Sequence, residues 1–128
     1  MQLTEADADK AYALACDAIQ LRVRERIGPR CIVFFSAYAR DADKVPVDNL
    51  DDVPVPGKLQ IKRGRVRKIQ RSEDYESSIL ENASWLDLCV IANEQITVTR
   101  DRDHRYLEDI EIIEVIDGVQ IATLRLES

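Results

Sequence analysis

The chain has 128 residues, of which 45% are apolar and 33% are charged, and its formal net charge is −6. This length suits one domain with its own core, over residues 1–128, and the composition is typical of a folded chain. No apolar run approaches the ~20 residues of a membrane helix, and the acidic N-terminus lacks the layout of a signal peptide. We therefore expect a soluble, cytoplasmic protein and exclude membrane insertion.

Residues 4–27 form the clearest predicted element, a long helix. Thr4 and Asp7 have the spacing of a capping pair, and Gly28 followed by Pro29 ends the helix. Small and apolar side chains cover more than half of its circumference: Ala8, Ala11, Tyr12, Leu14, Ala15, Cys16, Ala18, Ile19, Leu21, Val23 and Ile27. One flat sheet needs a narrower stripe, so we expect a sheet that curves around the helix, or a second chain on its remaining face.

Two arginines, Arg22 and Arg26, lie inside this apolar arc one turn apart. The ordinary interpretation is that their stems cover apolar surface near the helix end while their charges reach water, where they also suit the helix dipole. The alternative is a cationic pair at the mouth of a pocket.

The next segment changes from apolar to acidic. Cys31–Ala37 predicts a buried strand, with a short buried helix as the alternative. Residues 39–57 contain three prolines and five aspartates, which predicts an extended acidic loop. A loop this long in a small domain is usually functional or disordered. Its Asp48, Asp51 and Asp52 are candidate contacts for a partner.

Residues 58–71 carry seven Lys or Arg residues and no acid, whereas residues 1–57 have a net charge of −3 and residues 72–128 of −10. A hairpin turning at Arg63-Gly64 would place Ile61 opposite Val66 and Lys62 opposite Arg65. Its basic face is either neutralised within the domain or docks onto an acidic partner. The candidate contacts are Lys58, Lys62, Arg63, Arg65, Arg67, Lys68 and Arg71.

Ser72 predicts the cap of a short second helix that ends near Ser84. Glu73, Asp74 and Glu76 would lie in its first turn, where the helix dipole favours acids, and they are further candidate contacts for a partner.

Two more hairpins are predicted after this helix. Residues 86–92 would pair with residues 95–100, and residues 107–115 with residues 119–127 through a three-residue turn that ends at Gly118. That turn would place Val115 opposite Val119 and Ile113 opposite Ile121. The predicted fold is therefore α+β: a long N-terminal helix and one short second helix on a curved, mostly antiparallel sheet of about six to seven strands, with three β-hairpins.

Groups for catalysis are scarce. The one histidine, His104, lies in the charged segment Arg100–Arg105, which is typical of a solvated turn; the alternative is a D-x-D-H metal or proton-transfer cluster. No nucleophile motif or glycine-rich phosphate loop is present. Cys16, Cys31 and Cys89 have neither disulfide nor zinc spacing. We predict no catalytic residue, no metal and no cofactor. We therefore expect a binding protein rather than an enzyme.

The preferred function is a small protein-interaction module that binds a macromolecular partner through charged surfaces. An inhibitor, an immunity-type protein or an assembly protein would have this charge segregation and this poverty of catalytic groups. Nucleic-acid binding through residues 58–71 is an alternative, although no aromatic residue lies among the cations to stack on bases. A homodimer is a further alternative.

The order of long helix, hairpin, short helix and antiparallel strands resembles that of the superfamily of nuclear transport factor and ketosteroid isomerase. The resemblance covers the first helix and residues 58–127, while Cys31–Ala37 stands where that superfamily has a second N-terminal helix. It implies a cone with a ligand-binding or enzymatic pocket between the first helix and the sheet. Tyr12, Arg22 and Arg26 would then be the polar groups of that pocket.

Overall fold

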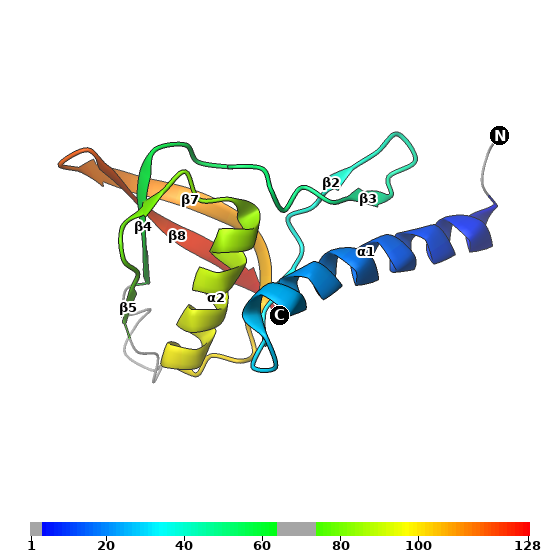
Figure 1. Ribbon diagram of the computed structural model, residues 1–128, viewed down its shortest axis with the longest axis horizontal. Helices are drawn as coiled ribbons and strands as arrows, with labels where there is room; N and C mark the ends of the chain where they lie inside the picture. The colour runs from blue at the N-terminus through cyan, green and yellow to red at the C-terminus, as the bar shows by residue number, and fades with distance from the viewer. Residues whose placement is uncertain (1–3, 64–73) are drawn as a thin grey trace.

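The computed structural model describes residues 4–63 and 74–128 as an α+β domain (Figure 1). The elements, in chain order, are α1 (Glu5–Ile27), β1 (Phe34–Phe35), β2 (Ala39–Arg40), β3 (Pro46–Val47), β4 (Lys58–Arg63), β5 (Tyr75–Glu76), β6 (Leu80–Glu81), α2 (Trp85–Thr99), β7 (Tyr106–Ile116) and β8 (Val119–Glu127). The predicted fold class is confirmed: a long N-terminal helix, a shorter second helix and a mostly antiparallel mixed sheet.

The first helix begins and ends where the sequence predicts. The Thr4 hydroxyl accepts a hydrogen bond from the Asp7 N–H (3.1 Å), and Gly28 ends the helix with a φ of 96°. Within α1 only Ile19 and Val23 are buried, and Leu14 is 60% exposed. The N-terminal half of α1 projects away from the main sheet (Figure 1). The sheet therefore meets only the C-terminal half of the helix, and much of the wide apolar arc stays uncovered.

The acidic loop at residues 39–57 contains regular structure. Its strands β2 and β3 pair with each other, and the arm that they form lies beside the N-terminal half of α1 (Figure 1). Tyr38, just before β2, packs edge-on against Tyr12 of α1 with ring centroids 6.2 Å apart, and the guanidinium of Arg40 lies 5.5 Å from both rings. Farther along, Leu50 and Val55 enter the core.

The main sheet has the strand order β1-β7-β8-β4-β5, with β6 also paired to β4. The long hairpin β7–β8 is antiparallel, while β8 pairs with β4, and β7 with β1, in parallel. Leu59, Ile61, Leu107 and Ala122 on these strands are buried together with apolar residues of α2. The helix α2 covers one face of the sheet (Figure 1).

Residues 85–99 form the helix α2, so the hairpin predicted from residues 86–100 is wrong. Leu88, Cys89, Ala92 and Ile96 are buried at helical spacing, and Ser84 with Asp87 forms a capping box. The many β-branched residues favour a strand locally, but the sheet needs an apolar helix on its face, and burial outweighs that preference. The short helix predicted before Ser84 is also wrong, because residues 75–76 and 80–81 are the strands β5 and β6.

The strand β4 confirms part of the predicted basic hairpin, whose residues 64–71 lie outside the described ranges. The backbone of Ile61 pairs with Ala122 of β8 on one side and accepts a hydrogen bond from the Ser77 N–H (2.8 Å) on the other. Lys62 pairs with Glu76. Both edges of β4 are thus occupied. The predicted pairs Ile61–Val66 and Lys62–Arg65 involve residues that lie outside the described ranges.

The C-terminal hairpin is confirmed, but with a different turn. Ile116 pairs with Val119 across the two residues Asp117 and Gly118, whose φ angles are 51° and 79°. These left-handed angles are those of an Asp-Gly hairpin turn, so the predicted three-residue turn and the Val115–Val119 pair are wrong. The pairing slips between Leu107 and Asp109 and again between Ile112 and Glu114. Ile113 therefore lies at a bulge, and Glu114 takes the predicted place opposite Ile121.

The start of α2 gives a test of pH dependence. Burial raises the pKa of the Asp87 carboxyl, but hydrogen bonds from the Ser84 N–H (3.0 Å) and Arg26 (3.0 Å) outweigh it and hold this pKa below its ordinary value. A lowered pKa in the folded state stabilises the fold above about pH 4, and this stabilisation is lost as the pH falls through the folded pKa.

We expect Asp87→Ala to lower the free energy of unfolding by about 1 kcal/mol at pH 7, and by much less in acid below the folded pKa of Asp87, where the wild-type protein also lacks this charge. Urea unfolding at the two pH values measures this difference. Asp103→Ala, at an exposed carboxylate, is the control and should change little at either pH. A loss that is equally large in acid would show that the charge of Asp87 is not what stabilises the helix.

Candidate partner-binding surface

The described part of the predicted basic face is largely neutralised within the domain. Lys62 lies 3.8 Å from the carboxylate of Glu76, and Arg63 binds Asp101 at 3.0 Å. Lys58 is exposed. The other candidate contacts of this segment, Arg65, Arg67, Lys68 and Arg71, lie outside the described residues, as does Glu73. Of the described cations of β4, Lys62 and Arg63 therefore make ion pairs within the domain, and Lys58 faces solvent.

The predicted acidic contacts divide into two groups. Asp48 and Asp51 both bind the guanidinium of Arg22, at 2.7 and 2.9 Å, and so fasten the loop to α1. Glu76 accepts a hydrogen bond from Gln60 (3.0 Å) as well as facing Lys62. Asp52 and Asp74 are exposed. Three of these five described carboxylates are thus engaged in internal contacts.

A cleft of about 540 Å³ lies between α1 and β1. Its lining includes Cys16, Gln20, Arg24, Phe34, Tyr38 and Tyr106. The pocket residues expected from the sequence do not line it: Tyr12 packs on Tyr38, Arg22 binds the acidic loop, and Arg26 binds Asp87. Arg24 lies 5.8 Å from the ring centroid of Phe34.

A second charged cluster joins β4 to the segment between α2 and β7. The Nδ1 atom of His104 lies 3.0 Å from one oxygen of Asp101, whose other oxygen accepts from Arg63. Burial raises the pKa of the Asp101 carboxyl, but the hydrogen bond with His104 and the charges of His104 and Arg63 outweigh it and lower that pKa. Across residues 4–63 and 74–128, no group of three His, Cys, Asp or Glu side chains could hold a metal ion. The cluster links Arg63 of β4 to Asp101 and His104, in the segment before β7.

The outer edge of β7 is the feature that sequence reasoning missed. The strand runs over Tyr106–Ile116, but β1 pairs only with Tyr106 and Leu107. Beyond Leu107, β8 is the one strand paired with β7 within the described ranges. Residues 108–116 therefore present backbone donors and acceptors along one open edge, where the Ile110 N–H is hydrogen-bonded to the Asp109 side chain (2.8 Å).

Large aliphatic side chains are exposed along this same part of β7. The exposed fractions are 45% for Ile112, 61% for Ile113, 63% for Val115 and 46% for Ile116. The sequence contained a signal for this: consecutive aliphatic residues occupy both alternating sets of positions, whereas a strand with one buried face alternates apolar with polar. One face alone cannot bury all of them.

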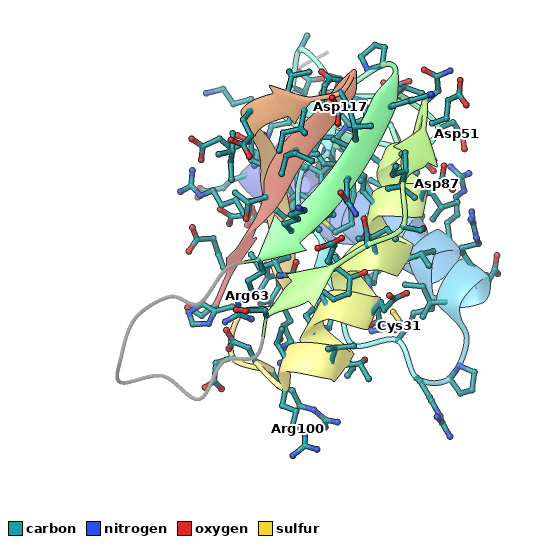
Figure 2. All side chains as sticks on the ribbon, turned by 90° about the vertical axis from the view of Figure 1, so that its left-hand side faces the viewer. Cys31, Asp51, Arg63, Asp87, Arg100 and Asp117 are labelled. Atoms are coloured by element: carbon teal, nitrogen blue, oxygen red, sulfur yellow. The ribbon has the colours of Figure 1, made fainter. Side chains whose placement is uncertain are left out.

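The edge is also strongly acidic. Between Tyr106 and Asp117 the chain has five carboxylates and no Lys or Arg. Glu108, Asp109, Glu111 and Glu114 on β7 are exposed. Figure 2 shows Asp117 at the opposite end of the sheet from Arg63, so Arg63 does not neutralise the hairpin tip. Lys58, at the start of β4, lies next to Gln120 of β8 and is the cation of β4 nearest to this end of the hairpin. An apolar strip flanked by like charges is left facing solvent.

No protein-family model, curated protein or solved structure matches this chain. In the part of the chain that the structure describes, no helix is long and apolar enough to cross a membrane.

Proposed function

We propose that this protein is a protein-interaction module whose β7–β8 hairpin binds another protein, as an inhibitor, an immunity-type protein or an assembly factor would. The observation that carries the proposal is the combination, on residues 108–116, of an open strand edge, four exposed aliphatic side chains and four exposed carboxylates. Exposed apolar surface rimmed by charge is typical of interaction sites. The partner is expected to be basic.

The internal ion pairs favour this hairpin over the surfaces first expected from the sequence. Arg22, Lys62 and Arg63 already have acidic partners within the chain. A partner that bound them would have to replace contacts that the fold makes by itself. Arg125 of β8 lies near Glu108 and Asp109 of β7, but its side chain hydrogen-bonds to Glu127 at 2.8 Å. None of the ion pairs within the described residues involves a carboxylate of β7. The hairpin keeps its negative charge available for a partner.

Site-specific photocrosslinking tests the proposal. A photoreactive residue at Ile113 should form an adduct with another polypeptide in the native host, with a yield that falls as salt is added to an extract. The matched control is the same residue at Val53, which is 38% exposed and lies in the segment before β4. The proposal fails if Ile113 gives no adduct, or if both positions give the same adducts.

A further inference from the structure

We infer that the partner binds as an added β-strand: an extended segment with alternating basic and aliphatic residues that pairs with the outer edge of β7. This inference rests on the proposed function and specifies the chemistry of the partner. Strand addition uses backbone hydrogen bonds for affinity and alternate side chains for specificity. The open edge of β7 has unpaired backbone groups for affinity, and its charged and apolar side chains can provide specificity.

The position for the added strand has a defined start. The Ser36 N–H donates to the Leu107 carbonyl (2.8 Å), which is the last contact between the β1 segment and β7. The outer edge of β1 is itself covered by Gln20, whose amide accepts from the Phe35 N–H (3.1 Å) and donates to the Val33 carbonyl (2.9 Å). A further strand therefore cannot add beside β1, but it can continue the line of β1 along β7.

The position also has a defined end. The turn at Asp117-Gly118 closes the hairpin, and at about 3.3 Å per residue the stretch from residue 108 to residue 116 spans roughly 30 Å. The bulges near residues 108 and 113 bend the strand and interrupt its regular pattern. We therefore expect a partner segment of about six or seven residues.

The charges select the composition of that segment. Side chains directly opposite each other on neighbouring strands interact, so Lys or Arg on the added strand would lie beside Glu111 and Glu114. Aliphatic residues between them would cover Ile112 and Val115, which point toward the same face as Ala122 and Gln120, their partners on β8.

The same charges argue against a second copy as the occupant. Two β7 edges brought together would place carboxylates against carboxylates, and natural proteins use charged edge residues to prevent such pairing. Phosphate-bearing surfaces would be repelled for the same reason. The carboxylates of β7 would attract a strand that carries Lys or Arg.

Calorimetry with synthetic peptides tests the inference. The probe is the capped peptide Lys-Val-Lys-Ile-Lys-Val-Lys, and the matched control is the same sequence N-methylated on its three central residues. The control keeps the charges and side chains but loses the central backbone donors on both edges. We expect the probe to bind and the control to lose affinity by at least about tenfold, since the central donors are removed and the methyl groups obstruct close approach of the backbone to β7.

Each other outcome overturns the addition of a basic strand. Equal binding of both peptides would show docking by charge alone, and it would leave the proposed function standing. If neither peptide binds, the basic strand is the wrong occupant, and crosslinking from Ile113 separately decides whether the hairpin binds a protein. A stable dimer of the protein that excludes the probe would make a second copy the occupant.

Discussion

Asn93→Leu should lower the free energy of unfolding by about 2–5 kcal/mol. Asn93 lies on the buried side of α2, with 8% of its surface exposed. Its side-chain oxygen accepts from the N–H groups of Ile32 (2.6 Å) and Val33 (3.0 Å), and its nitrogen donates to the Arg30 carbonyl (3.2 Å). Leucine has a similar volume but leaves two backbone donors unpaired, at about 1–3 kcal/mol each.

Urea unfolding followed by the fluorescence of Trp85, the one tryptophan, measures this loss. The control is Thr97→Ala, one turn farther along the same helix at an exposed position. It should stay within about 0.5 kcal/mol of the wild type. A loss below about 1 kcal/mol for Asn93→Leu would mean that the segment before β1 is not held by this side chain. That segment leads into β1, which marks the start of the open edge of β7.

Glu111→Lys combined with Glu114→Lys should weaken binding of the lysine-rich probe peptide by about 100-fold, which corresponds to about 2.7 kcal/mol. Both carboxylates are exposed on the open part of β7. The substitutions replace attraction with repulsion directly opposite the added strand. The fold should tolerate them, because they also relieve the crowding of like charges on β7.

The matched control for this double variant is Glu25→Lys combined with Asp103→Lys. It changes the net charge equally, at exposed positions outside β7. Calorimetry should show a decrease of less than about threefold for the control, since screening weakens attraction from distant charges. An equal loss in both variants would mean that net charge, and not the edge of β7, attracts the peptide.

Local signals in the sequence were enough to predict α1 and the β7–β8 hairpin. Thr4, Gly28 and Gly118 act on residues near them in the chain, so a pattern of a few residues reveals the ends of the helix and the place of the hairpin, though not the two-residue form of its turn. The helix α2 was missed because β-branched residues such as Ile91 and Val98 favour strands locally. Its burial against β4 and β8 depends on contacts that are distant in sequence.

The candidate surface could be predicted only in part, for the same physical reason. The charge segregation was visible, but ion pairs such as Arg22–Asp48 and Arg63–Asp101 join residues 26 and 38 positions apart. Whether a strand lies at an edge depends on all the other pairings. The open edge of β7 exists because β1 is only two residues long and β4 pairs with β8 instead.

Amide hydrogen exchange of this protein, alone and saturated with the lysine-rich probe peptide, tests strand addition at β7 most directly. Because an added strand pairs with the outward-facing donors of β7, exchange should slow within residues 109–116. Amides of β4 should exchange at unchanged rates, since both edges of that strand are already paired. Unchanged exchange across residues 109–116 in the peptide-bound protein would contradict the account.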